Sequence, residues 1–157
     1  MVEDNEEMEI CMFDDTEKIV QSGVIPYRKT DEGYEVLMIT SRRTGAWQFP
    51  KGYMEPGMEP EESAAKEAFE EAGVEGQVYN TLIGEYEYTK HYRTYCVELY
   101  PLQVTHILDE WEEKGQRRRA WWTPARAIDV LTSPALQGIL QTFMRSDPAR
   151  WETSSFL

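Results

Sequence analysis

The sequence predicts an α+β domain, a sandwich in which helices cover a mixed β-sheet. The order of its segments is the first reason, because β-forming stretches come first, then a helical stretch, then two more β-forming stretches and two further helices. Size is the second reason, since 157 residues with 41% hydrophobic side chains predict one domain with a substantial core.

The strands are predicted from runs of β-forming residues bounded by turn residues. Residues 30–33, Thr-Asp-Glu-Gly, separate the first two runs and indicate a hairpin. Pro50 ends a third, short run, and a polar stretch from Thr89 to His91 separates the last two. The predicted strands are Lys18 to Tyr27, Tyr34 to Thr40, Trp47 to Phe49, Leu82 to Tyr88 and Tyr92 to Val104.

Helix signals are clearest between Pro60 and Ala72. Proline opens this segment, acidic residues fill its first turn, and Gly73 follows its last periodic residue, which is the usual arrangement of start and stop signals. Two amphipathic helices are expected to begin near Pro124 and Pro134.

The two ends of the chain are expected to lie outside the domain. Residues 1–17 carry eight acidic side chains and no Lys or Arg, which is typical of a mobile, solvated tail. A short segment docked through Ile10 to Phe13 is the alternative. We therefore expect a tail over 1–17, the domain over 18–146 and a C-terminal tail over 147–157.

Composition excludes several classes of protein. A net charge of −13 argues against general nucleic-acid binding, which depends on cationic surfaces. No apolar run is long enough to cross a membrane and the N-terminus is acidic, so we expect a cytoplasmic protein without a membrane partner. Cys11 and Cys96 lie far apart and are expected to be free thiols. The oligomeric state is left open.

Three carboxylates share one face of the predicted helix. Glu67, Glu70 and Glu71 are spaced at i, i+3 and i+4, and the alanines of the helix lie on the opposite side. Like charges at this spacing repel one another. A solvated acidic face remains an alternative if the helix is considered alone.

The loop before this helix favours a metal site. Residues 50–57 are rich in Gly and Pro and bring backbone carbonyl groups beside the carboxylates. Oxygen ligands suit Mg²⁺ or Mn²⁺, which keep water and substrate phosphates in their remaining positions. Zinc is disfavoured because neither His nor Cys is nearby.

The segment from Gly52 to Val74 resembles the Nudix box. This pattern is a Gly, a Glu six residues later, Arg-Glu, an apolar residue, a Glu-Glu pair, and a Gly followed by an apolar residue. Two positions depart from it: Met58 replaces the early Glu, and Lys66 replaces the Arg. In the family those residues brace the loop and orient the carboxylates. The matching residues are Gly52, Glu67, Ala68, Glu70, Glu71, Gly73 and Val74.

Similarity to the diphosphoinositol polyphosphate phosphohydrolase branch of this family extends from about residue 18 to 143. It implies the Nudix α/β/α sandwich and hydrolysis of a diphosphate bond in a highly phosphorylated small molecule. Dinucleoside polyphosphates, inorganic polyphosphate and diphosphoinositol polyphosphates all remain open as substrates.

The resemblance also implies roles for individual residues. Glu67, Glu71 and the backbone carbonyl of Lys51 are the implied ligands of Mg²⁺ or Mn²⁺, and Glu70 is the implied general base. Arginine is suited to bidentate phosphate contacts, so cations outside the box are expected to bind substrate. Arg117 and Arg118 could simply balance nearby acids. The candidate substrate-binding residues are Ser41, Arg42, Arg43, Lys90, His91, Arg93 and Arg119.

Two further expectations concern activity. The first predicted strand has no basic residue after Lys18, where the diphosphoinositol branch carries cations, so linear substrates are expected to be preferred over inositol pyrophosphates. The alternatives are a noncatalytic Nudix module that binds a phosphorylated ligand, and a nucleotide-sugar or nucleoside-triphosphate pyrophosphatase. The negative charge disfavours decapping of messenger RNA.

Overall fold

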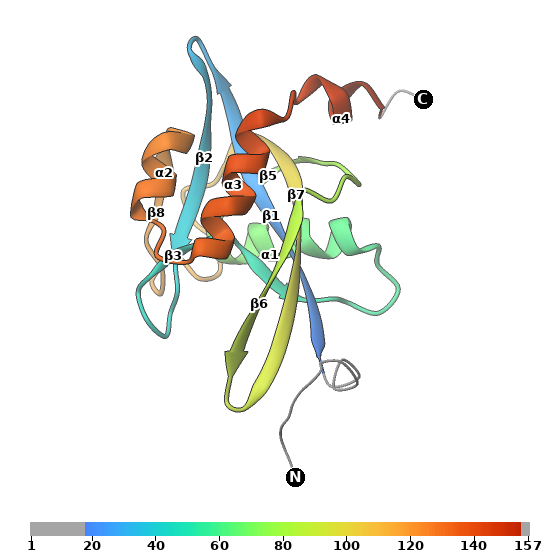
Figure 1. Ribbon diagram of the computed structural model, residues 1–157, viewed down its shortest axis with the longest axis vertical. Coiled ribbons are helices and arrows are strands. Elements are labelled where there is room, and N and C mark those ends of the chain that lie inside the picture. The colour runs from blue at the N-terminus through green and yellow to red at the C-terminus, as the bar shows by residue number, and fades with distance from the viewer. Residues whose placement is uncertain (1–17, 155–157) are drawn as a thin grey trace.

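A computed structural model describes residues 18–154, with eight strands and four helices in this range (Figure 1). The expectations for 1–17 lie outside the described residues. The strands are β1 (Ile19–Thr30), β2 (Gly33–Thr40), β3 (Trp47–Gln48), β4 (Lys51–Tyr53), β5 (Val74–Val78), β6 (Gly84–Lys90), β7 (Arg93–Ile107) and β8 (Arg119–Trp122). The helices are α1 (Pro60–Ala72), α2 (Pro124–Val130), α3 (Pro134–Arg145) and α4 (Ala149–Ser154).

All eight strands belong to one mixed sheet. Its centre is the parallel pair β1 and β7, in register from Ile19 opposite Tyr95 to Tyr27 opposite Gln103. The other pairs are antiparallel: β1 also pairs with β2 and β4, and β7 pairs with β5 and β6. β2 in turn pairs with β3 and β8.

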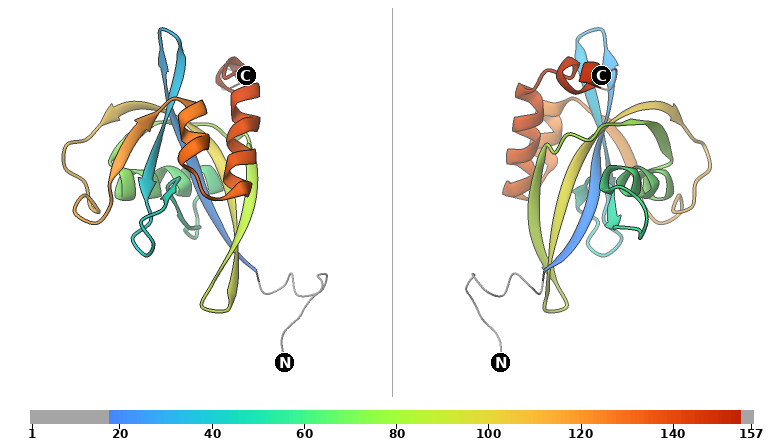
Figure 2. Two further views of the ribbon diagram at one scale, coloured as in Figure 1. Left: turned by 60° about the vertical axis from the view of Figure 1, so that its left-hand side comes forward. Right: turned by 90° about the vertical axis from the view of Figure 1, so that its right-hand side faces the viewer.

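Helices cover both faces of the sheet, as Figure 2 shows, with α1 on one face and α2 and α3 on the other. Alternation along β1 explains how one strand serves both layers, because successive side chains point to opposite faces. Val24 belongs to the cluster packed against the alanines of α1, whereas Ile25 belongs to the cluster that contains Leu140 and Phe143 of α3. The predicted sandwich is confirmed.

Helix α1 has the bounds that the sequence predicts because both of its ends are encoded locally. The backbone N–H of Glu59 donates to the Glu62 carboxylate at 3.4 Å, and proline occupies the first turn. Gly73 adopts the left-handed conformation at φ 67° and donates its N–H to the carbonyl of Phe69 at 3.2 Å. Ala64, Ala68 and Ala72 are fully buried against the sheet.

Several short elements were not predicted. β4, β5 and β8 contain three to five residues each, and each exists because a longer strand pairs with it. Helix α4 follows the last predicted helix, and its Trp151 is only 3% exposed. The indole N–H of Trp151 donates to the Tyr27 hydroxyl at 3.0 Å, so residues beyond 146 contact the β1–β2 hairpin.

Candidate active site

A groove of about 910 Å³ opens beside α1 at the end of the sheet. Its walls come from segments that are far apart in the sequence: β1, the β2–β3 loop and β3, β4 and the loop after it, α1, β6, the β7–β8 connection and the start of α3. Among the lining residues are Ser41, Arg42, Arg43, Lys51, Gly52, Glu67, Glu71, Lys90, Glu113 and Arg117.

Glu67 reaches the groove because position 52 has no side chain. A Cβ built on Gly52 would overlap the Glu67 carboxylate carbon and both of its oxygens. Strand β4 therefore approaches α1 closely enough to bring the Glu67 carboxylate against the backbone of the loop. Burial raises the pKa of Glu67, and the charge of Glu70 raises it further.

Glu71 lies one turn further along α1 and is 7% exposed. Its Oε1 accepts a hydrogen bond from the backbone N–H of Lys51 at 3.3 Å, and its Oε2 lies 3.7 Å from the Arg117 guanidinium. Burial raises the pKa of Glu71 to about 7, although Arg117 and the Lys51 N–H both favour its ionised form. The effect of burial on this pKa is therefore larger than the effect of the two contacts.

Glu70 is held differently from its two neighbours. Its carboxylate pairs with the Lys66 ammonium at 2.5 Å, and Lys66 also contacts Glu55 at 3.3 Å. Both contacts raise the pKa of Lys66. The structure does not place Glu70 among the groove-lining residues, whereas Glu67 and Glu71 are among them.

This Lys66–Glu55 contact provides a brace where the box departs from the usual pattern. Met58 has no charge to offer at the early Glu position, and Glu55, three residues earlier, supplies the carboxylate instead. The buried Ser63 hydroxyl adds a second tie, since it donates to the Tyr53 carbonyl and accepts from the Glu55 N–H. The loop is therefore fastened to α1.

The oxygen atoms at this site suit a hard divalent cation. Glu67 and Glu71 bring carboxylates together beside the backbone of Lys51 and Gly52, with neither His nor Cys lining the groove. Over residues 18–154, no three His, Cys, Asp or Glu side chains converge into a complete metal-binding group. Mg²⁺ typically takes one or two carboxylates and completes its shell with water and substrate phosphates, so these residues fit Mg²⁺ or Mn²⁺.

Four of the predicted substrate-binding residues line the groove: Ser41, Arg42, Arg43 and Lys90. Arg42 donates to the Gln116 side-chain oxygen at 2.8 Å, which ties the β2–β3 loop to the β7–β8 connection. The Ser41 hydroxyl accepts the N–H groups of Arg43 and Thr44, each at 3.2 Å, and so shapes the loop itself.

The other three predicted residues lie elsewhere. His91 forms the tip of the β6–β7 hairpin with φ 52°, and Arg93 is the exposed first residue of β7. Arg119 donates to the carbonyls of Ala72 and Leu108 at 2.8 and 2.7 Å and lies 3.8 Å above the Trp111 ring. It supports the C-terminal end of α1 rather than the groove.

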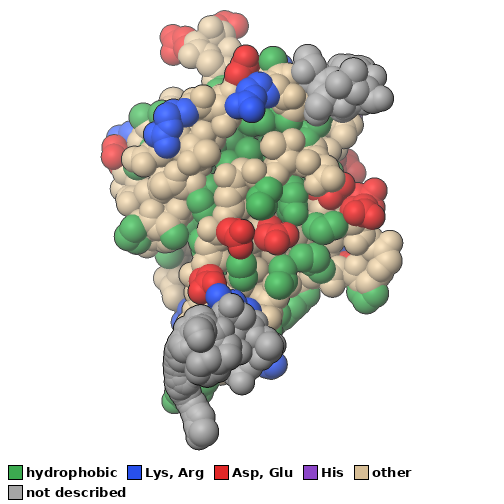
Figure 3. All heavy atoms as spheres, turned by 45° about the vertical axis from the view of Figure 1, so that its right-hand side comes forward, with side chains coloured by type: hydrophobic (Ala, Val, Ile, Leu, Met, Phe, Trp, Pro, Cys, Tyr) green, Lys and Arg blue, Asp and Glu red, His purple; other side chains and the backbone are tan. Residues whose placement is uncertain are grey.

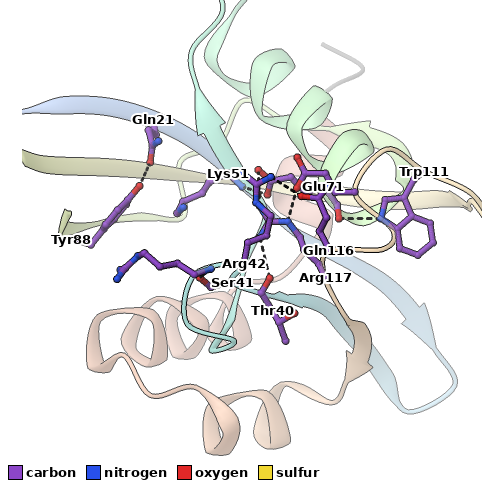
Figure 4. Close-up of polar contacts among 12 residues, drawn as sticks. Gln21, Thr40, Ser41, Arg42, Lys51, Glu71, Tyr88, Trp111, Gln116 and Arg117 are labelled. Atoms are coloured by element: carbon purple, nitrogen blue, oxygen red, sulfur yellow. Dashed lines mark hydrogen bonds and ion pairs between the residues drawn. The ribbon is translucent and has the colours of Figure 1, made fainter. Parts of the chain in front are cut away.

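The structure adds side-chain contacts at the groove that sequence reasoning missed, involving Tyr88 and the ammonium of Lys51. The ammonium of Lys51 lies 4.8 Å above the Tyr88 ring, and the Tyr88 hydroxyl donates to Gln21 at 2.7 Å. Figure 4 shows this pair on one wall, and Lys51, Glu71 and Arg117 gathered beside it. The Lys-Gly pair at residues 51 and 52 was a sequence signal for this part of the groove. The contact between Arg117 and Glu71 joins residues far apart in the sequence, so no local signal could reveal it.

Basic side chains do not form a broad surface on the face drawn in Figure 3, where Lys and Arg lie singly and acidic side chains occupy the middle. In the groove, by contrast, Arg42, Arg43, Lys51, Lys90 and Arg117 lie within one site. Across 18–154, every helix is too short or too polar to cross a bilayer.

Comparisons with known proteins agree with this architecture. The NUDIX domain family matches residues 18–143. Diphosphoinositol polyphosphate phosphohydrolase 3-beta of Bos taurus is 39% identical over 115 residues, which cover 71% of this chain and 68% of that protein.

Two solved structures share the fold. The Ap4A hydrolase of C. elegans has a TM-score of 0.67 at 19% identity, covering 81% of this chain and 96% of that one. The NUDIX domain of Shewanella oneidensis NrtR, determined in complex with ADP ribose, has a TM-score of 0.63 at 14% identity, covering 82% of this chain and 88% of that one. Nudix hydrolases generally use divalent metal ions. Because the family match spans nearly all of the described sandwich, the chain belongs to the NUDIX domain family of hydrolases.

Proposed function

We propose that this protein is a Mg²⁺- or Mn²⁺-dependent hydrolase that cleaves a phosphoanhydride bond in a highly phosphorylated small molecule. One observation carries the proposal: Glu67 and Glu71 meet the Lys51–Gly52 backbone in a groove that also contains five cationic side chains. Carboxylates for a metal and cations for phosphate groups are the two requirements of phosphoryl transfer to water.

Each group has a distinct task. Glu67, Glu71 and the Lys51 carbonyl would hold the metal, which when bound would supply positive charge to the phosphate oxygens and lower the pKa of water. Lys90 of β6 and the β2–β3 loop residues Arg42 and Arg43 all line the groove and would bind the phosphate chain. Glu70 is the proposed general base, and Lys66 orients its carboxylate.

Linear substrates such as dinucleoside polyphosphates or short polyphosphate are proposed to be preferred over inositol pyrophosphates. The part of β1 that faces the groove presents Gln21, a neutral side chain whose oxygen is already engaged by Tyr88. Lys18, which directly precedes β1, pairs with Glu87 at 2.6 Å. Because Gln21 is the residue of β1 that lines the groove, a compact, densely phosphorylated ring would gain no cationic contact from this strand.

The direct test follows hydrolysis of a panel of diadenosine hexaphosphate, short polyphosphate, a diphosphoinositol polyphosphate and a nucleotide sugar by chromatographic separation of the products, because cleavage of the first and the last gives two organic phosphates and no inorganic phosphate. We expect turnover with Mg²⁺ or Mn²⁺ and none in excess EDTA. Full turnover in EDTA would overturn the metal mechanism. Ligand binding without turnover across the panel would instead support a noncatalytic Nudix module.

A further inference from the structure

The β7–β8 connection places a buried cation next to a proposed metal ligand. The side chain of Arg117 is 7% exposed, and its guanidinium lies between two carboxylates, Glu71 at 3.7 Å and Glu113 at 2.7 Å. A third contact, from Arg117 to the Thr40 carbonyl at 3.0 Å, fixes it to the end of β2. A buried arginine in this position would be expected to capture the Glu71 carboxylate.

The distances show that Glu113 holds the arginine more closely than Glu71 does. Arg117 Nε donates to Glu113 Oε1, a charge-assisted hydrogen bond, while the approach to Glu71 exceeds hydrogen-bond length. The Glu113 side chain is 13% exposed, so solvent screens this pair only weakly. The backbone N–H of Glu113 also donates to the Glu70 carbonyl at 3.1 Å, which fixes the connection onto α1.

Local charge leads to the same conclusion. Lys51 and Arg117 are the cations whose charges act on Glu71. Pairing with Glu113 offsets the charge of Arg117, which leaves more of the negative charge of Glu71 for a divalent cation.

We infer that Glu113 is a positioning residue for the metal site: by pairing with Arg117 it keeps that guanidinium from neutralising Glu71. This inference rests on the proposed function, because it concerns the same pair of metal-binding carboxylates. In this role Glu113 acts through Arg117 and does not contact the substrate.

The test compares Mn²⁺ binding by the full chain, measured without substrate by electron paramagnetic resonance. Glu113→Gln keeps the shape of the side chain but removes its charge, and should raise the Kd for Mn²⁺ by about tenfold, as the loss of a group behind a metal ligand commonly does. Glu112→Gln, an exposed neighbour, is the matched control and should leave the Kd unchanged. Excess Mn²⁺ should restore kcat in Glu113→Gln.

A second variant separates positioning from a merely structural role. If Arg117 is the competitor, Arg117→Met added to Glu113→Gln should bring the Kd back to within about threefold of the unmodified chain. Should the methionine variant fail to fold, as judged by circular dichroism, Arg117→Gln takes its place.

The outcomes are distinct. Equal Mn²⁺ binding by the unmodified chain and by Glu113→Gln would overturn the inference and leave the proposed function intact. A double variant whose Kd for Mn²⁺ is no lower than that of Glu113→Gln would also overturn the inference. An unmodified chain that neither binds Mn²⁺ nor hydrolyses any substrate of the panel would overturn the proposed function and this inference with it.

Discussion

The carboxylate of Glu67 occupies the space that a side chain at position 52 would need. Gly52 is thus required for close approach rather than for an unusual backbone angle, since its φ is not positive, unlike that of Gly57 at 84°. The position of a proposed metal ligand depends directly on the absence of one methyl group on the neighbouring strand.

Gly52→Ala should displace the Glu67 carboxylate, weaken Mn²⁺ binding and lower kcat. Overpacking of this kind commonly costs about 1–3 kcal/mol of stability, so the unfolding temperature should fall as well. Gly138→Ala is the control, because a Cβ at that helical position meets open space and alanine is a better helix former. Equal Mn²⁺ binding in Gly52→Ala and the unmodified chain would contradict the close-approach argument.

Substitution of the three carboxylates separates their roles. Glu70→Gln should lower kcat by ~10²–10⁴-fold, the usual contribution of a general base, while Mn²⁺ binding is mostly retained. Glu67→Gln and Glu71→Gln should weaken Mn²⁺ binding itself. Glu70 is paired with Lys66 and lies outside the groove lining, so its role as the base needs this direct test. A loss of kcat smaller than tenfold in Glu70→Gln would exclude it as the base.

Stability of the metal-free protein should depend on the ionisation of Glu71. Its pKa is about 7 in the folded chain and near the ordinary 4.5 in the unfolded chain, so the folded state binds the proton more tightly. The contribution of Glu71 to the free energy of unfolding is therefore fully present below the ordinary pKa of 4.5 and is lost as pH rises through about 7. Glu71→Gln cannot ionise, and in EDTA at pH 8 it should be more stable than the unmodified chain, on the order of 1–3 kcal/mol.

The same comparison has two internal checks. At pH 5 the difference in unfolding temperature between Glu71→Gln and the unmodified chain should shrink. Saturating Mg²⁺ at pH 8 should stabilise the unmodified chain and not the variant, because a ligand stabilises only the form that binds it. If Glu71→Gln is less stable than the unmodified chain at pH 8 in EDTA, the ionised Glu71 carboxylate does not destabilise the folded state.

Substrate choice should respond to one position on β1. Gln21→Arg places a cation on the groove wall and should raise kcat/KM for a diphosphoinositol polyphosphate relative to diadenosine hexaphosphate by roughly tenfold, the value of one charge-assisted phosphate contact. Gln77→Arg, on exposed β5, is the control for net charge. A preference of the unmodified chain for the inositol substrate would refute the reading of β1 as a neutral wall.

The parts of the fold that could be predicted are those whose signals are local. Helix α1 is one, because Pro60 and Gly73 mark its ends within the segment itself. Strand β8 could not be predicted in the same way, since its four residues are extended only because β2 pairs with them.

The residues of the site can also be separated into those with a local sequence signal and those without one. Spacing placed Glu67, Glu70 and Glu71 on one helix face, and the resemblance to the Nudix box indicated Glu67 and Glu71 as metal ligands; both line the groove. The contact between Arg117 and Glu71 spans 46 residues of sequence, and a run of three arginines after an acidic stretch gives no sign of which one turns inward. Arg117 is buried beside the carboxylates, whereas Arg119 supports the end of α1.

The burial of Trp151 matters to anyone who shortens this protein. The family match ends at residue 143, and a truncated gene product ending there would lose the indole that packs on Phe143 and donates to Tyr27. It would also lose Glu152, which accepts from the Tyr27 hydroxyl and pairs with Lys29 at 2.7 Å. The aromatic side chains of Tyr27 and Phe143 would then face solvent, so such a product should be prone to self-association during purification. Fusion partners should therefore be attached after α4.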